Sequence, residues 1–472
     1  MSSSTSIGSK LLRGGQWIAL AALLNALLTV SSNGLLARLL SQKELGVYFA
    51  LYSGSVTAAS MCLLGMNQSI VRFVSSSLAD EKPGLAKGYI TTAFTLLAWA
   101  LMALGAIVLA CALPFGLELN GIAKYTGFAL FFAWSTTLAI RTLIAESLRG
   151  FHEIGLATLF SGLLTSSLTV TILSLAYLVS RDFMLRDAIA IAVGSVLITI
   201  VISFVFLKRK ADPIVAVTPP PSAREMAIRS MPLLGSTTGF LLMRDSHLWV
   251  LSTIAPVSEV ALLGAALYFV RLLTVPLALA NSLIQPSVAH LHAKGSLENL
   301  DVLLRGSAAC VLFCALCGFA VLAIFGSPLM VLLYGENYAA AYSPLLIICL
   351  GQLVNVGVGS PGVLLAMTGH ERAVLIAALS ASLLGVVVTL MLGPIIGANG
   401  AATGIAVAVV IHNVMMWLLA RVRVGIWTHA SFFALKRGLA KLYLVSSSQP
   451  GARGADRLIA FLLRPIAGGK QR

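Results

Sequence analysis

The chain has 472 residues, of which 58% are hydrophobic and only 10% are charged, and its formal net charge is +15. Soluble domains carry about 25% charged residues, so this composition excludes an ordinary water-soluble enzyme. The basic residues are separated by apolar stretches instead of forming one basic block, which argues against a nucleic-acid-binding protein.

Apolar stretches long enough to cross a bilayer as helices follow one another from residue 15 to residue 420. We predict twelve spans, at 15–37, 46–68, 89–113, 124–148, 155–179, 186–207, 231–254, 260–288, 303–326, 340–367, 373–396 and 399–420. The connecting loops are short and leave almost no chain for a soluble catalytic domain. The sequence therefore predicts an all-α polytopic membrane protein with about 12 transmembrane helices.

The polar segments divide this chain into five regions. We expect a cytoplasmic N-terminus at 1–14, a first six-helix bundle at 15–207 and a second at 230–420. Between the bundles, a cytoplasmic linker at 208–229 contains the run Lys208-Arg209-Lys210 and three consecutive prolines. The region 421–472 is a basic cytoplasmic tail, in which a mixture of aromatic and basic residues after Trp427 is typical of an amphipathic segment on an anionic membrane surface.

The distribution of Lys and Arg predicts the orientation. With both termini in the cytoplasm, 24 of the 32 basic residues fall in cytoplasmic segments and five in outside loops. By the positive-inside rule, this asymmetry places both termini in the cytoplasm. The even number of spans agrees with that orientation. We expect a multi-pass membrane protein with both termini in the cytoplasm.

Weak sequence matches recur at an offset of about 215 residues. Glu44 and Glu259 lie near the starts of the second and eighth spans, and Asn67 and Asn281 follow at nearly the same offset. Six spans in each half give the halves the same orientation, so we expect a parallel repeat of two six-helix bundles around a central cavity. The glycine-rich run from Gly357 to Gly362 interrupts the tenth span, where it predicts a hinge or a packing kink.

Charged residues inside the predicted spans are the candidates for function, because a charge in the apolar core usually faces a cavity or a partner. Arg244 and Arg271 lie within the seventh and eighth spans, and Arg141 lies in the fourth. Planar guanidinium groups suit phosphate or pyrophosphate, so we predict an anionic head-group site. Asp245 is the candidate for ion coupling, although neighbours on one helix point about 100° apart and should not pair cleanly.

Uncharged polar residues in the spans provide candidate contacts to sugar hydroxyls, or hydrogen bonds between helices. These candidates are Asn25, Asn33, Asn281, Gln352 and Asn355. The sequence contains neither a Walker motif nor a His-Glu-x-x-His motif. We therefore expect a protein that is not an enzyme, with no cofactor and no metal site.

Four segments resemble the polysaccharide-biosynthesis membrane proteins, the oligosaccharide-lipid flippases of the Wzx type in the multidrug/oligosaccharidyl-lipid/polysaccharide exporter superfamily. They are Gly34-Leu35-Leu36-Ala37-Arg38-Leu39-Leu40-Ser41-Gln42-Lys43-Glu44-Leu45-Gly46-Val47-Tyr48, the stretch from Leu64 to Phe73, the element Tyr334-Gly335-Glu336-Asn337-Tyr338, and the turn Gly397-Ala398-Asn399-Gly400-Ala401-Ala402. The resemblance implies a two-bundle transporter of the bacterial inner membrane that works by alternating access.

This family resemblance also implies a substrate. It would be an oligosaccharide linked through pyrophosphate to undecaprenol, moved from the inner to the outer leaflet for surface or exopolysaccharide assembly. The expected partners are this glycolipid, membrane lipids, a polysaccharide polymerase and glycosyltransferases. Two alternatives stay open: a cation-coupled small-molecule or drug antiporter of the same superfamily, and a lipid II flippase. The first span has no Asp or Glu of the kind that drug exporters use.

Overall fold

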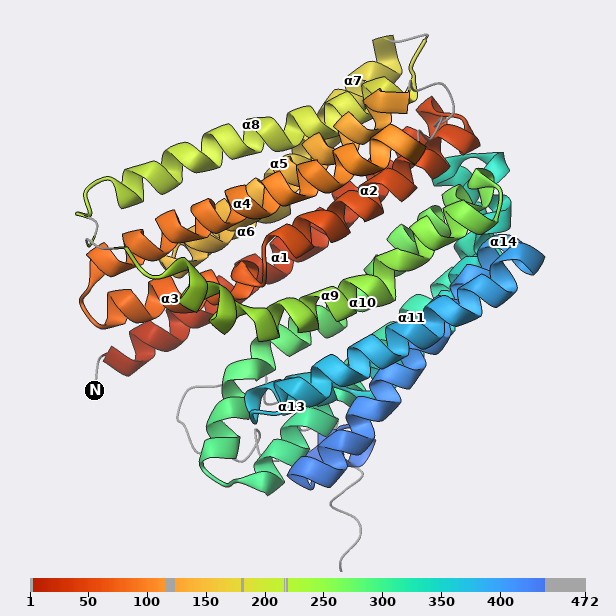
Figure 1. Cartoon of the computed structure of the whole chain (residues 1–472). Coiled ribbons are helices and arrows are strands. Elements are labelled where there is room, and N and C mark those ends of the chain that lie inside the picture. The colour runs from red at the N-terminus through yellow and green to blue at the C-terminus, as the bar shows by residue number, and fades with distance from the viewer. Residues whose placement is uncertain (1–2, 116–123, 180–181, 216, 218–219, 438–472) are drawn as a thin grey trace, which may run out of the picture. The chain divides into compact units, whose positions relative to one another are not determined.

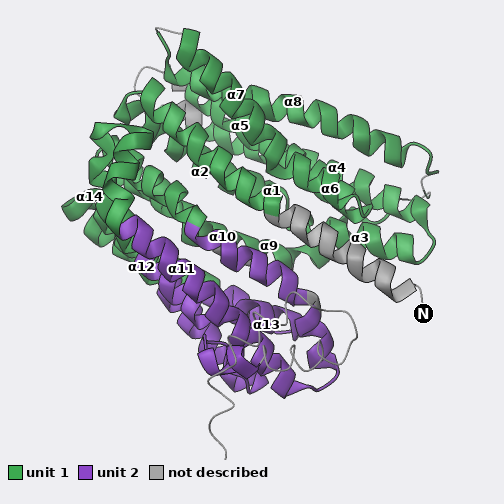
Figure 2. Cartoon of the chain, turned by 180° about the vertical axis from the view of Figure 1, so that it is seen from behind, with its two compact units in different colours: residues 1–272, 324–348, 378–408 green, residues 273–323, 349–377, 409–472 purple. Residues whose placement is uncertain are grey.

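The computed structural model describes residues 3–115, 124–179, 182–215, 217 and 220–437, and these residues form helices joined by short turns. The chain divides into two compact units, coloured separately in Figure 2. The first unit contains 1–272, 324–348 and 378–408, and the second contains 273–323, 349–377 and 409–472.

Helices of the first half of the chain run side by side in the first unit (Figure 1). They are α1 (Ser3–Leu39), α2 (Gln42–Cys62), α3 (Met66–Ala79), α4 (Pro83–Phe115), α5 (Lys124–Gly150), α6 (Ile154–Thr158), the π-helical turn η1 (Leu159–Leu163), α7 (Leu164–Val179) and α8 (Leu185–Ala211). Helix α5 packs against α2, α3, α4 and α8, while α1 packs against α7. The central position of α5 is consistent with its fully buried Trp134 and Leu143.

The second half of the chain supplies α9 (Ala223–Ile254), α10 (Val257–Ala293), α11 (Leu297–Tyr334), the 3₁₀ helix η2 (Glu336–Ala341), α12 (Tyr342–Val358), α13 (Pro361–Met367) and α14 (Glu371–Val424). Ten helical segments among the described residues are long and apolar enough to cross a membrane. Helix α14 is one of these ten but contains two arms, and the 32-residue α9 is a further helix of spanning length. The predicted architecture of about twelve spans is confirmed.

Helix α14 bends back on itself at Ile396 and Gly397, where the backbone leaves helical geometry. Gly397 has a φ of +55°, a conformation that glycine adopts without steric cost. The two arms lie against each other, because a Cβ added at Gly385 would be 2.6 Å from Ala408 Cβ. Glu259 accepts a hydrogen bond of 2.8 Å from the Ala398 backbone N–H and so caps the second arm.

The start of α2 meets the start of α10, which are the segments related by the sequence repeat. Glu44 and Ser41 form a capping box at the N-terminus of α2. One turn further on, Gly46 lies so close to the Val257 carbonyl oxygen that a Cβ would overlap it. Both repeat-related glutamates, Glu44 and Glu259, thus cap a helix N-terminus. This close crossing holds α2 and α10 together beside the candidate site.

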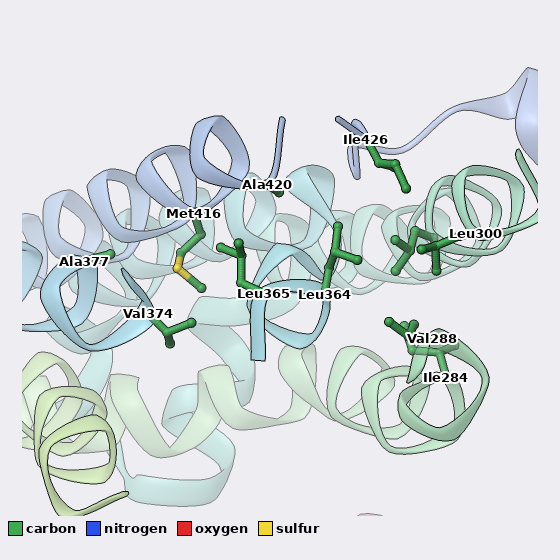
Figure 3. Packing of buried hydrophobic residues seen from close by; sticks show 11 residues of the cluster. Ile284, Val288, Leu300, Leu364, Leu365, Val374, Ala377, Met416, Ala420 and Ile426 are labelled. Carbon is green, nitrogen blue, oxygen red and sulfur yellow. The ribbon is translucent and has the colours of Figure 1, made fainter. Parts of the chain in front are cut away.

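The second unit has its own apolar core. Figure 3 shows the cluster, which is built from the C-terminal part of α10, the start of α11, α13 and both ends of α14. Its members are Ile284, Val288, Leu300, Leu304, Leu364, Leu365, Val374, Ala377, Met416, Ala420 and Ile426. Ile426 lies beyond α14, so the chain after this helix is part of the core.

Residues 425–431 form a strap over the break between α12 and α13. The break leaves the Gly357 and Val358 carbonyl groups outside the helical ladder. The Ala430 N–H donates to Gly357 O at 2.8 Å, and the Thr428 hydroxyl donates to Val358 O at 2.9 Å. The strap therefore satisfies the acceptors that the break exposes. Residues 432–437 are helical, and 438–472 of the predicted tail lie outside the described residues.

Candidate functional site

Arg244 and Asp245 on α9 form a bidentate ion pair. Arg244 Nε lies 3.1 Å from both carboxylate oxygens, and its Nη2 lies 2.6 Å from Asp245 Oδ2. The expectation that these helical neighbours would not pair cleanly is wrong, because the long arginine side chain folds back toward the carboxylate. The Asp245 side chain is only 8% exposed, whereas that of Arg244 is 48% exposed. About half of the Arg244 side chain surface therefore stays accessible.

Arg271 and Arg141 come from two further helices of the first unit. Arg271 on α10 lies over the ring of Tyr268, with its Cζ 4.7 Å from the ring centroid. Arg141 on α5 donates to Thr165 Oγ1 at 3.4 Å. Tyr52 lies within electrostatic range of both Arg141 and Arg244. The structure thus groups the three predicted arginines around two tyrosines, Tyr52 and Tyr268.

A cavity of about 100 Å³ lies within the first unit beside these tyrosines. Its lining residues come from α1, α2, α5, α7, α8 and α10: they are Thr29, Ser32, Asn33, Tyr48, Tyr52, Trp134, Leu138, Arg141, Thr165, Ser166, Thr169, Ala192, Val196 and Tyr268. Among the described residues of this lining, Arg141 is the only one with a charged side chain. The cavity is therefore polar and positively charged, with an aromatic wall.

The aromatic wall was not among the predicted site features. Tyr48 and Tyr52 are four residues apart on α2, and their rings stack at 6.5 Å. Trp134 on α5 approaches them at 5.2 and 5.3 Å. The i, i+4 spacing of two tyrosines in an apolar span was a detectable signal, since it places both rings on one helix face. The contribution of Trp134 depends on tertiary packing.

Two of the five predicted sugar contacts lie at or beside the cavity. Asn33 lines it and is 5% exposed. Asn25 accepts a hydrogen bond of 2.9 Å from the lining residue Ser166. The other three belong to the second unit and do not line this cavity. There, Asn281 accepts from Ser360 at 2.5 Å, and Asn355 donates to Gln352 at 2.8 Å.

Solved structures with a similar fold are transport proteins. A multidrug resistance MATE family transporter of the MOP superfamily, in an inward-facing conformation, aligns with a TM-score of 0.63 and 14% identity, covering 89% of this chain and 96% of that one. The lipid II flippase MurJ, in an inward closed conformation, aligns with a TM-score of 0.64 and 15% identity. The alignment covers 95% of this chain and 97% of MurJ. A MOP superfamily transporter from Pyrococcus furiosus, described as having a binding pocket of reverse polarity, aligns with a TM-score of 0.51 and 12% identity. That alignment covers 87% of this chain and 95% of the other.

At these identities the likeness establishes the fold alone, which this chain shares with these transport proteins. A comparison with curated protein sequences gave no significant match. A family model does match more than half of the chain, from residue 11 to residue 292, and it describes polysaccharide biosynthesis proteins. This multi-pass membrane protein therefore belongs to the polysaccharide biosynthesis protein family.

Proposed function

We propose that this protein is a flippase that moves an undecaprenyl-pyrophosphate-linked oligosaccharide from the inner to the outer leaflet by alternating access. It would act in the bacterial inner membrane with both termini in the cytoplasm. Glycosyltransferases would supply the glycolipid, and a polymerase would consume it after translocation. Membership of the polysaccharide biosynthesis family and the flippase fold of a structural neighbour support this proposal.

The grouping of three arginines inside the spans carries the proposal. Arg244 lies ten residues before the end of α9 and Arg271 lies fourteen after the start of α10, so they are about 15 and 21 Å from the turn that joins these helices. Asp245 is the acidic partner of Arg244, and the side chain of Arg244 stays 48% exposed in this pair. A guanidinium that stays accessible at this depth favours an anionic partner. A pyrophosphate that crosses the bilayer needs the complementary cationic site.

Transport of a reconstituted glycolipid tests this function. The protein in liposomes would receive a fluorescent undecaprenyl-pyrophosphate oligosaccharide, and the initial rate of its exposure on the opposite leaflet would be measured. Arg244→Ala and Arg271→Ala should each reduce the rate at least tenfold, because each removes charge-assisted hydrogen bonds to the pyrophosphate. Arg229→Ala is the matched control, since Arg229 lies on the same helix as Arg244, is 61% exposed and pairs with an exposed glutamate.

Two competing outcomes would overturn the proposal. Rapid counter-transport of a cationic dye with no glycolipid movement would favour a drug antiporter. Movement of lipid II in preference to the oligosaccharide would favour a lipid II flippase. Unchanged glycolipid rates in both arginine variants would remove the head-group assignment.

Asp245 provides the candidate for coupling to an ion gradient. Its ion pair with Arg244 must loosen for the carboxylate to bind a proton or a metal cation, so substrate binding at Arg244 and cation binding at Asp245 would favour one another. Asp245→Asn should therefore abolish any stimulation of flipping by a proton or sodium gradient. A gradient effect that persists unchanged in Asp245→Asn would exclude this role.

A further inference from the structure

The short helical segment after the strap leaves two aromatic and two basic side chains exposed. Phe432 and Phe433 are 65% and 66% exposed, and Lys436 and Arg437 are exposed as well. Ala434, between them in the chain, is only 4% exposed. We call the four exposed residues the aromatic-basic surface. Large apolar side chains that gather on a surface beside charges mark an interaction site.

Contacts with α11 fix which side of this segment stays exposed. A Cβ added at Gly306 of α11 would lie 3.6 Å from Leu435 Cα and 3.7 Å from Ala434 O. The Ser431 N–H donates to Arg305 O at 3.3 Å, and the Ser431 hydroxyl accepts a hydrogen bond of 3.3 Å from the Ala434 N–H. These contacts attach the segment to α11 and leave the aromatic-basic surface uncovered by the described part of the chain.

The position of the segment along the chain places it at the surface of the bilayer. The second arm of α14 runs from Ala398 to Val424 and is therefore about 40 Å long, which is enough to cross the hydrocarbon core. The residues that follow this arm lie at the level of the lipid head groups. Aromatic and basic side chains are favoured at this level, because rings enter the acyl boundary while cations stay with the head groups.

The charges of this region select an anionic partner. Residues 421–437 contain Arg421, Arg423, Lys436 and Arg437 and no acidic residue. Arg437 Cζ lies 4.6 Å from the centroid of the Phe433 ring, so a cation and an aromatic face are presented together. An anionic phospholipid matches both features, since its phosphate attracts the cations and its acyl chains accept the rings. A zwitterionic lipid lacks the net charge.

We propose that the aromatic-basic surface binds anionic phospholipid of the surrounding bilayer, and that this binding holds the strap on the break between α12 and α13. Phe432 directly follows the strap, whose residues satisfy the Gly357 and Val358 carbonyl groups. A strap fixed at its end by lipid leaves these carbonyl groups less often. The inference goes beyond the proposed flippase function and does not depend on the transport of a glycolipid.

Hydrogen exchange of the whole chain in lipid nanodiscs tests this inference. Residues 426–431 should exchange roughly threefold or more slowly in discs that mix phosphatidylglycerol with phosphatidylcholine than in discs of phosphatidylcholine alone. The double variant Lys436→Gln with Arg437→Gln should remove this difference, and Phe432→Ser with Phe433→Ser should reduce it. Equal exchange of the wild type in the two kinds of disc, or a difference that persists in the Lys436→Gln with Arg437→Gln variant, would overturn the proposal.

The matched control is Lys208→Gln with Arg209→Gln. This exposed basic pair also lies at the end of a spanning helix, and Arg209 Cζ lies 5.8 Å from the centroid of the Phe206 ring. The control should keep the full difference between the two kinds of disc, and its loss there would show a general effect of charge. Loss of the difference in Arg453→Gln with Arg457→Gln would assign the lipid contact to residues 438–472 instead.

A salt titration of the wild type keeps the test independent of any variant. Raising KCl from about 0.05 M to about 0.5 M should shrink the difference in exchange about twofold or more, because salt screens the attraction between exposed cations and lipid head groups. A difference that does not respond to salt would contradict the role of the cations. Since the discs contain no glycolipid, the result is separate from the outcome of the flippase assay.

Discussion

Arg271 lies over the ring of Tyr268, and the same ring packs against Phe49 of α2 at a centroid distance of 5.1 Å. The tyrosine thus joins a charged residue of α10 to the helix that bears Tyr52. Tyr268 also lines the cavity beside Arg141. The Tyr268 ring therefore contacts Arg271 and also belongs to the wall of the cavity that Arg141 lines.

Replacing this ring should affect transport through the position of Arg271. Tyr268→Leu removes the cation–π contact, which contributes about 1–2 kcal/mol when desolvated, and should lower the initial flipping rate about tenfold. Tyr268→Phe keeps the ring and should stay within twofold of the wild type. Equal losses in the two variants would show that the hydroxyl group, and not the ring face, is what matters.

The crossing of α2 and α10 should not tolerate a methyl group at Gly46. Gly46→Ala places a Cβ against the Val257 carbonyl oxygen, a backbone atom that cannot turn aside, and should destabilise the protein by about 1–3 kcal/mol. Gly194→Ala is the matched control, since Gly194 is also helical but a Cβ there would meet no described atom within 4 Å. The thermal unfolding midpoint in detergent measures the stability of both variants. A Gly46→Ala midpoint equal to that of the control would contradict the close crossing.

The strap should make Gly359 more sensitive than another glycine with the same backbone conformation. Gly359 has a φ of +85° and Gly369 a φ of +80°, so alanine costs about 1–2 kcal/mol of backbone strain at either position. At Gly359 the new Cβ would also overlap the Thr428 carbonyl oxygen, whereas Gly369 faces open space. The unfolding midpoint should therefore fall further for Gly359→Ala. Equal falls in the two unfolding midpoints would mean that the strap can move away from the new Cβ with no loss of stability.

His429 in the strap should make its packing sensitive to acid. Arg305 Nη2 lies 3.3 Å from His429 Nε2, and the Trp417 indole N–H donates to Nδ1 at 3.3 Å. Burial is the largest cause that lowers the pKa of His429 below its usual 6.5, and the charge of Arg305 adds to it, while Asp301 acts in the opposite direction.

The sign of this pH dependence follows from the lowered pKa. The unfolded strap binds a proton more readily than the folded one, so its stabilisation is complete above about pH 6.5 and declines as the pH falls below that value. Hydrogen exchange at residues 426–430 should accelerate between about pH 7.5 and about pH 5.5, after correction for the intrinsic rate. His429→Gln should remove this acceleration. Identical pH profiles in the two proteins would rule out His429 as the responsible group.

Much of the architecture was predictable from local composition. Apolar length predicted the spans, because a bilayer requires about 20 apolar residues in each helix whatever its neighbours are. The arginine positions predicted where charge would gather, since a guanidinium in a span must find a cavity or a partner. The interruption expected between Gly357 and Gly362 is present as the boundary between α12 and α13.

Three features depended on tertiary structure. Arg244 pairs with its neighbour Asp245, because the carboxylate is buried and the flexible arginine side chain can fold back to it. The wall of Tyr48, Tyr52 and Trp134 requires α2 and α5 to pack together, and no local pattern records that contact. The strap satisfies carbonyl groups some seventy residues earlier in the chain.

The sequence by itself determined which segments enter the membrane and what charge they bring, because burial in lipid acts on each residue separately. Only the tertiary structure decided which polar and aromatic side chains lie together, because that depends on how side chains from different helices meet.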